Sequence, residues 1–147
     1  MSSPYLSSES RHASTVAIGG RAVLIAGRSG SGKSDLALRL IDRGATLVSD
    51  DYTLLKRVGG RLVASAPPNI AGKMEVRGVG ILPFDTVSDV PVCLYVDLEA
   101  DVDRLPELSE LERIIGVDIP RIALKALEPS APLKVEVALA HFGLALA

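Results

Sequence analysis

The chain has 147 residues, 48% of them hydrophobic and 23% charged, which is enough for one domain with a core and too few for two. Its 16 Lys and Arg residues against 18 Asp and Glu residues give a net charge of −2, and only Lys56 and Arg57 adjoin, so no nucleic-acid-binding surface is indicated. A single cysteine, Cys93, excludes an internal disulfide, and no apolar run is as long as a signal-peptide core or a membrane span, so we expect a cytoplasmic protein.

The chain begins with a serine-rich segment. We expect residues 1–11 to be flexible, without regular structure, and residues 12–147 to form one domain. Residues 15–18 and 22–26 have the apolar character of two strands, and Gly19 and Gly20 between them predict a tight turn. Two short strands therefore precede the glycine-rich segment that follows.

An amphipathic helix is predicted over residues 34–43, with one apolar stripe and Gly44 at its carboxyl end. The next apolar run, residues 46–49, predicts a strand that returns beside the first one. It ends in Asp50 and Asp51, so two carboxylates are expected at the carboxyl end of a strand.

The middle of the chain is rich in predicted strands. Gly59 and Gly60 predict a two-residue hairpin turn between strands at residues 52–58 and 61–65. Glycine and proline then divide the chain into short extended pieces. These pieces are residues 74–77, 78–82 and 92–97.

The last third is expected to mix helix and strand. Leu108, Leu111 and Ile115 are spaced as in a helix, which predicts one over residues 105–115. Residues 119–127 predict a strand, and residues 132–146 predict a buried helix that is apolar all round. The expected fold is α/β: a mixed sheet with flanking helices in a single domain.

The motif that carries chemistry is GRSGSGKS, a full match to the phosphate loop G-x-x-x-x-G-K-[ST] between a predicted strand and a predicted helix. Its backbone N–H groups can surround phosphate oxygens, with the helix dipole adding positive charge. Lys33 is expected to contact the β- and γ-phosphates of ATP, and the Ser34 hydroxyl to bind Mg²⁺. The nucleotide-binding residues are Gly27, Arg28, Ser29, Gly30, Ser31, Gly32, Lys33 and Ser34.

Acidic residues must supply the remaining chemistry of a phosphoryl transfer, which needs a metal ligand and a proton acceptor. The adjacent pair Asp50 and Asp51 could fill both roles, although it could also be an ordinary aspartate turn before the hairpin. Asp97, at the end of another apolar strand, is a weaker metal candidate because an acidic loop follows it.

Five further segments resemble the catalytic, C-terminal domain of the bacterial HPr kinase/phosphorylase family, in the order in which that family has them. They include LIDRGATLVSDD beside the family's LI-x-RG-x-x-LV-x-DD, and MEVRGVGI beside its signature LEIRGLGI. The segments lie at residues 40–51, 74–81, 103–105, 116–121 and 135–142. His12 also precedes the phosphate-loop strand, as a histidine does in the family.

The resemblance implies a serine protein kinase that uses ATP and Mg²⁺ to phosphorylate HPr, the small phosphocarrier protein of the phosphotransferase system. It implies a phosphate-loop fold similar to that of phosphoenolpyruvate carboxykinase. Members of the family are commonly homo-oligomers, and the resemblance allows one here without setting the number of subunits.

Site roles follow from the resemblance at the matching residues only. Glu75 would be a second metal ligand beside Ser34, and the aspartate pair would include the base that takes the proton of the substrate serine. His12 would lie near that pair and orient it or tune its pKa. Arg104 would stabilise charge on the transferring phosphoryl group.

Two departures from the family change the expectation. No segment of this sequence resembles the family's N-terminal domain, so we expect the short form found among some proteobacteria. A P-G-R-N loop, linked in the family to dephosphorylation by phosphate, is replaced by EPSAP at residues 128–132. Because this segment lacks arginine to bind inorganic phosphate, we expect kinase activity with weak or absent phosphorylase activity.

Two other functions compete with this one. A small-molecule kinase would need an arginine-rich lid, and Arg104, Arg113 and Arg121 are too scattered to form one. A non-catalytic module that senses ATP would need the phosphate loop but gain nothing from a proton acceptor such as the aspartate pair provides.

Overall fold

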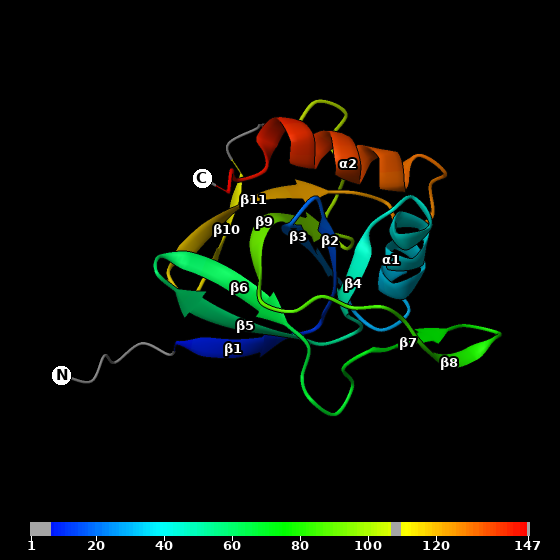
Figure 1. The fold of residues 1–147 in the computed structure, drawn as a ribbon. Helices are drawn as coiled ribbons and strands as arrows, with labels where there is room; N and C mark the ends of the chain where they lie inside the picture. The colour runs from blue at the N-terminus through cyan, green and yellow to red at the C-terminus, as the bar shows by residue number, and fades with distance from the viewer. Residues whose placement is uncertain (1–6, 107–109, 147) are drawn as a thin grey trace.

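A computed structural model describes residues 7–106 and 110–146, which form a single α/β domain (Figure 1). In these residues the elements are β1 (Ser8–Arg11), β2 (Ala13–Ile18), β3 (Arg21–Ala26), α1 (Lys33–Asp42), β4 (Thr46–Ser49), β5 (Thr53–Val58), β6 (Arg61–Ser65), β7 (Lys73–Val76), β8 (Gly80–Pro83), β9 (Val90–Asp97), β10 (Leu111–Ile114), β11 (Val117–Ala123) and α2 (Ala131–Phe142).

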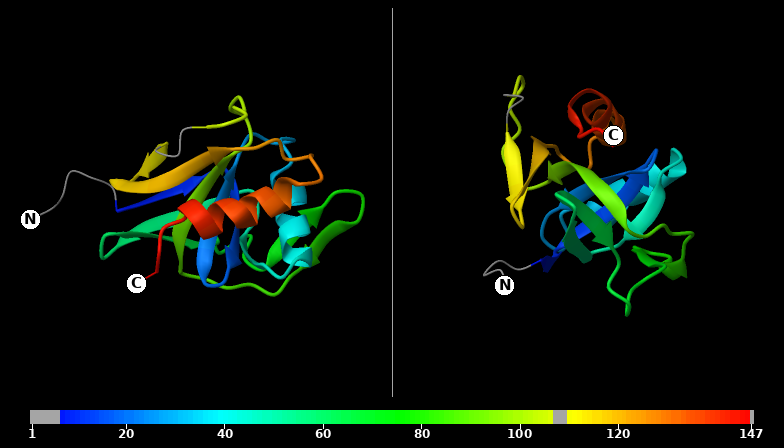
Figure 2. Two further views of the ribbon diagram at one scale, coloured as in Figure 1. Left: turned by 90° about the horizontal axis from the view of Figure 1, so that it is seen from above. Right: turned by 60° about the vertical axis from the view of Figure 1, so that its left-hand side comes forward.

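The main sheet is mixed and has nine strands, seven of them in the order β1-β5-β6-β9-β3-β2-β4. Strand β11 runs parallel to the end of β9, and β10 pairs with β11. At the centre, β3 runs parallel to β9, with Leu24 opposite Tyr95 and Ala26 opposite Asp97. The hairpin β7–β8 forms a separate small sheet and projects from the edge of the molecule (Figure 1 and Figure 2).

Strand β3 is apolar from Ala22 to Ala26 because both of its faces are buried there. Val23 and Ile25 pack into one core cluster with Leu40 of α1 and Val135 of α2. The alternate residue Leu24 faces a second cluster, inside the curve of the sheet. Both helices therefore cover one face of the central strands, and the outer strands close over the other face.

Three chain segments meet at one edge of the sheet. The strands β2 and β4 are antiparallel partners, and β2 is also antiparallel to β3. The carboxyl ends of β3 and β4 therefore lie beside the start of β2, where Ala13 pairs with Ala26 and Thr15 pairs with Ser49. This edge carries the phosphate loop, the aspartate pair and His12.

Most of the predicted elements are confirmed. The helix after the phosphate loop, the strand over residues 46–49 and the hairpin around Gly59 and Gly60 all form, with boundaries within one residue of those predicted. Gly59 and Gly60 have φ values of 55° and 80°, as the two-residue turn requires. Within the described residues, neither helix combines the length and apolar character needed to span a membrane.

The helix predicted over residues 105–115 is wrong. Leu111 to Ile114 form strand β10, and Ile115 and Gly116, with φ values of 49° and 76°, make a tight turn into β11. Leu111 is exposed, so its helical spacing from Ile115 does not mark a buried stripe. Leu108 lies outside the described residues.

Three other expectations differ in extent. Residues 8–11, expected to lack regular structure, form β1 because β5 offers a free edge, with Arg11 opposite Thr53. Strand β11 ends at Ala123 rather than at residue 127. Helix α2 is only half-buried, since Leu133 and Val137 remain exposed, and it ends at Phe142.

Candidate active site

The phosphate loop joins β3 to α1 and is shaped by glycines. Gly30 and Gly32 have φ values of 82° and 97°, a region of backbone conformation that favours glycine. A Cβ at Gly32 would also lie 2.8 Å from the Cβ of Ala126, so a side chain has no space there. No side chain within the described residues caps the start of α1, which leaves its first N–H groups free to bind an anion.

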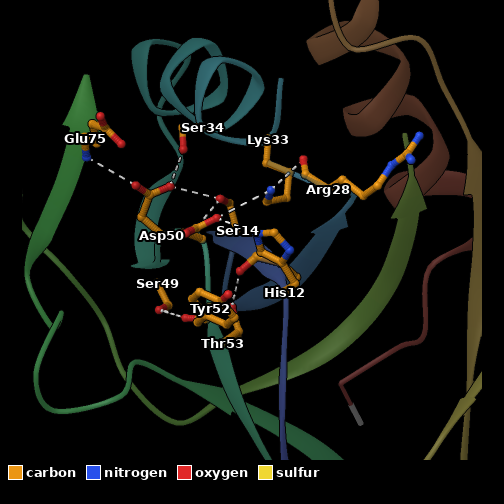
Figure 3. Close-up of polar contacts among 12 residues, drawn as sticks. His12, Ser14, Arg28, Lys33, Ser34, Ser49, Asp50, Tyr52, Thr53 and Glu75 are labelled. Atoms are coloured by element: carbon orange, nitrogen blue, oxygen red, sulfur yellow. Dashed lines mark hydrogen bonds and ion pairs between the residues drawn. The ribbon is translucent and has the colours of Figure 1, made fainter. Parts of the chain in front are cut away.

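Lys33 is the first residue of α1, and its side chain is only 4% exposed. Its Nζ donates a 3.0 Å hydrogen bond to the carbonyl of Arg28 across the loop and lies 3.5 Å from Asp51 Oδ1 (Figure 3). The ammonium group is therefore held between the phosphate loop and a carboxylate. Such a cation can neutralise phosphate charge at the mouth of the loop.

Asp50 is buried and accepts three hydrogen bonds (Figure 3). Its Oδ1 accepts from the hydroxyls of Ser34 at 2.6 Å and Ser14 at 2.9 Å, and its Oδ2 accepts from the backbone N–H of Glu75 at 3.2 Å. These bonds fix the orientation of the carboxylate against the first turn of α1. Asp50 can therefore hold Ser34, or a cation that Ser34 binds, but it offers no easy access to a substrate.

Asp51, by contrast, has a half-exposed side chain that contacts basic groups. Its Oδ1 lies 2.8 Å from Nε2 of His12 and faces the ammonium group of Lys33. Its backbone has a φ of 66°, and its N–H donates to the hydroxyl of Ser14 at 3.0 Å. This carboxylate is accessible, oriented by an imidazole and placed beside the phosphate loop, which is what a proton acceptor requires.

The residues present fit a nucleotide phosphate with a magnesium ion. Magnesium prefers oxygen ligands and commonly takes one or two from protein and the rest from phosphates and water. Ser34 Oγ and Asp50 Oδ1 bring two such oxygens together. Among residues 7–106 and 110–146, no three His, Cys, Asp or Glu side chains gather as a metal site by themselves.

Two predicted residues are placed differently from the rest. Glu75 reaches the cluster through its backbone N–H, while its side chain is exposed. Arg104 lies exposed in the segment between β9 and β10, and it makes no hydrogen bond or ion pair within the described part of the chain. The structure therefore groups His12, Lys33, Ser34 and the aspartate pair, and leaves Arg104 outside their contacts.

Asp97, the weaker metal candidate, is engaged by protein groups. Its Oδ2 accepts from Arg121 at 2.5 Å, and its Oδ1 accepts from the N–H groups of Glu99 at 2.8 Å and Ala100 at 3.0 Å. Burial disfavours the carboxylate, but these hydrogen bonds outweigh it, so the pKa of Asp97 is lowered. Asp97 therefore stabilises the loop after β9 rather than offering free oxygens.

Two residues of the site were missed by the sequence analysis. Ser14, fully buried, links the two aspartates through one hydroxyl, and Tyr52 stacks its ring on His12 with centroids 4.8 Å apart. Neither belongs to a motif. Ser14 lies just before the predicted strand of residues 15–18, so no local signal in the sequence marked it.

Comparisons with known proteins agree on one family. The sequence model described as "HPr Serine kinase C-terminal domain" matches residues 4–145. The HPr kinase/phosphorylase of Clostridium beijerinckii is 35% identical in an alignment covering 77% of this chain and 41% of that protein. That of Chlorobium limicola is 36% identical, covering 77% of this chain and 38% of that protein. The chain thus spans well under half the length of these curated relatives.

The fold is also similar to a solved structure. The HPr(Ser) kinase/phosphatase from Coxiella burnetii matches with a TM-score of 0.77 and 31% sequence identity. The match covers 90% of this chain and 94% of that chain. The likeness therefore extends over the whole domain and is not confined to the phosphate loop.

Proposed function

Because the chain belongs to the HPr serine kinase C-terminal domain family, we propose that it is a protein kinase that transfers the γ-phosphoryl group of ATP to a serine of an HPr-like phosphocarrier protein. The observation that carries this proposal is the place of Asp51. Its half-exposed carboxylate lies beside the phosphate loop, between His12 and Lys33. A protein that only sensed ATP would not need a carboxylate held in this way.

In the proposed reaction, the serine oxygen attacks the γ-phosphorus of ATP and the bond from that phosphorus to the β,γ-bridging oxygen breaks, releasing ADP. Asp51 accepts the proton of the serine hydroxyl as the new phosphorus–oxygen bond forms. His12 holds the carboxylate in place through its 2.8 Å contact. Lys33 offsets the negative charge of the phosphoryl group.

The phosphate loop would bind the nucleotide through the N–H groups of residues 27–34 and the start of α1. Ser34, oriented by Asp50, would hold Mg²⁺, with Glu75 as the second protein ligand. When bound, Mg²⁺ neutralises charge on the phosphate oxygens. We assign Arg104 no contact here, and a role for it on the phosphoryl group would require its loop to move towards the site.

The reverse reaction is proposed to be weak. Arg39 of α1 donates to the carbonyls of Glu128 and Ala126, and Lys134 pairs with the carboxylate of Glu128 at 2.7 Å. Arg39 and Lys134, two cations beside the EPSAP segment, are thus engaged with the protein itself. Phosphorylated carrier protein, incubated with phosphate, should release little pyrophosphate, and efficient release would contradict this part of the proposal.

The proposed partner is a carrier protein of the cytoplasm, and we place the enzyme there too. The charge distribution does not favour nucleic-acid binding. A homo-oligomer stays a prediction that sedimentation can test. The half-exposed carboxylate of Asp51 suits a protein segment that brings its own hydroxyl to it.

The test is transfer of labelled γ-phosphate from ATP to purified HPr of the same organism in the presence of Mg²⁺. Labelled serine is expected with the natural chain, and none with Lys33→Ala. The exposed Lys56, on strand β5, provides the matched control Lys56→Ala, which should keep wild-type activity. ATP binding that requires Lys33 without any labelling of HPr would instead support a different acceptor or an ATP sensor.

A further inference from the structure

We propose that Tyr52 is a positioning residue, which holds His12 against the carboxylate of Asp51 by stacking on its imidazole. The two rings lie nearly parallel, with an interplanar angle of 13° and centroids 4.8 Å apart (Figure 3). The same imidazole lies 2.8 Å from Asp51. The inference rests on the proposed function, because it assigns Tyr52 a part in placing the proton acceptor.

The backbone at Asp51 needs such support. Its φ of 66° is unusual for a residue with a side chain, and the N–H of Tyr52 donates to the carbonyl of Asp50 at 2.7 Å. That hydrogen bond makes Asp51 the middle residue of a three-residue turn, a strained conformation that persists only when its surroundings hold it. The turn directs the Asp51 carboxylate to one side and the Tyr52 ring to His12.

The pairing of β1 with β5 places His12 beside Tyr52. The last residues paired between β1 and β5 are Arg11 and Thr53. His12 comes directly after Arg11 and Tyr52 directly before Thr53, so both lie at the same end of this antiparallel pair. Beside them, the hydroxyl of Thr53 donates to the carbonyl of Ala13 at 2.8 Å. The stacked rings thus extend a strand pairing whose register is set by backbone hydrogen bonds.

The environment of Tyr52 indicates that its ring, rather than its hydroxyl, is what acts. Tyr52 is 48% exposed, and its phenol oxygen makes no hydrogen bond within residues 7–106 and 110–146. The charged groups facing the imidazole are the carboxylate of Asp51 and, beyond it, the ammonium of Lys33. A phenylalanine should therefore replace Tyr52 fully, whereas an alanine should leave the exposed face of His12 uncovered.

The first experiment uses no substrate. A face-stacked aromatic ring moves the proton resonances of its neighbour upfield, and the chain has two histidines, so the signals of His12 can be assigned with a His12→Gln variant. The upfield displacement of the His12 ring protons should be lost in Tyr52→Ala and kept in Tyr52→Phe. Equal His12 spectra in the wild type and Tyr52→Ala would overturn the proposal.

The second experiment measures kinase activity on HPr. Tyr52→Ala is expected to lower kcat about tenfold, as misplacement of a catalytic group does, with the KM for ATP unchanged within about twofold. Tyr52→Phe should restore kcat. Val58→Ala, which removes a 57% exposed side chain farther along β5, is the control and should match the wild type.

These results separate the two proposals. A wild-type chain that fails to label HPr contradicts the proposed function. The His12 spectra then test, independently of kinase activity, whether Tyr52 stacks on His12. An active wild type whose kcat survives Tyr52→Ala, or is not rescued by Tyr52→Phe, contradicts the positioning role while leaving the kinase in place.

Discussion

Ser34 donates a 2.6 Å hydrogen bond to Oδ1 of Asp50, although the two residues are 16 positions apart in the chain. This contact joins the first turn of α1 to the end of β4 and takes up one oxygen of a buried carboxylate. The neighbouring Asp51 turns away from that contact, towards His12 and Lys33. Two adjacent aspartates therefore have different surroundings, and different roles are expected of them.

Asp51→Asn is expected to remove the proton acceptor while leaving the nucleotide site intact. The amide cannot take a proton, so kcat for HPr phosphorylation should fall by about 10²- to 10⁴-fold. ATP affinity, measured by calorimetry, should change by less than about threefold because the phosphate loop is untouched. A variant that retained kcat would show that Asp51 is not the base.

Asp50→Asn is expected to act on the metal and on stability instead. An amide nitrogen placed where Oδ1 or Oδ2 now accepts would leave a buried donor without a partner, at a cost of about 1–3 kcal/mol in the free energy of unfolding. Ser34 would also lose its orienting acceptor, so half-maximal activity should need more Mg²⁺. Titration of activity with Mg²⁺ and urea unfolding would measure the two effects. An unchanged Mg²⁺ requirement would contradict the assignment of Asp50 to the metal side.

Gly32→Ala tests whether the phosphate loop needs glycine for space as well as for backbone freedom. Both Gly32 and Gly60 have positive φ, so alanine at either position should cost about 1–2 kcal/mol of stability. Only at Gly32 does the new Cβ meet an atom, the Cβ of Ala126 at 2.8 Å, whereas at Gly60 nothing lies within 4 Å. Gly32→Ala should therefore unfold at lower urea and bind ATP far more weakly. Gly60→Ala should bind ATP normally, and equal losses in both variants would contradict the steric argument.

Local signals explain which parts of the fold could be predicted. Helix α1 has an apolar stripe and a glycine at its end, and the β5–β6 hairpin has a glycine pair at its turn, so short stretches of sequence determine both. The turn between β10 and β11 places the β-branched Ile115 at a φ of 49°, which no turn rule anticipates. Strand β1 consists of polar residues and forms only because β5 lies beside it.

The same distinction applies to the candidate site. Lys33 and Ser34 belong to a contiguous motif, and the aspartate pair follows a strand directly, so their proximity could be expected from chain order. The contacts of Ser14 and Tyr52 depend on the register between β2, β4 and β5, which a single sequence does not encode in any local pattern. The catalytic and binding roles of all these residues stay predictions until variants are measured.

Asp97 provides a prediction about pH and stability. Its pKa is lowered in the folded protein because hydrogen bonds from Glu99, Arg121 and Ala100 outweigh the effect of burial. A carboxyl group with a lowered folded pKa stabilises the fold fully above its unfolded pKa, about 3.9, and this contribution is lost as the pH falls through the folded pKa. Asp97→Asn should therefore reduce the free energy of unfolding at pH 7 by about 1.5–3 kcal/mol, the range for hydrogen bonds to charged groups.

The difference between Asp97→Asn and the wild type should shrink as the pH falls below about 3.9, because the wild-type carboxyl then also loses its charge. Urea unfolding followed at pH 7 and at several acidic pH values would measure it. Asp118→Asn is the matched control, since the Arg113–Asp118 pair has the same chemistry at 3.0 Å but a more exposed carboxylate. Exposed pairs contribute about 0–1 kcal/mol, so this variant should stay close to the wild type at every pH. A loss in Asp97→Asn that stayed constant down to the lowest pH would show that the charge of Asp97 does not stabilise the loop after β9.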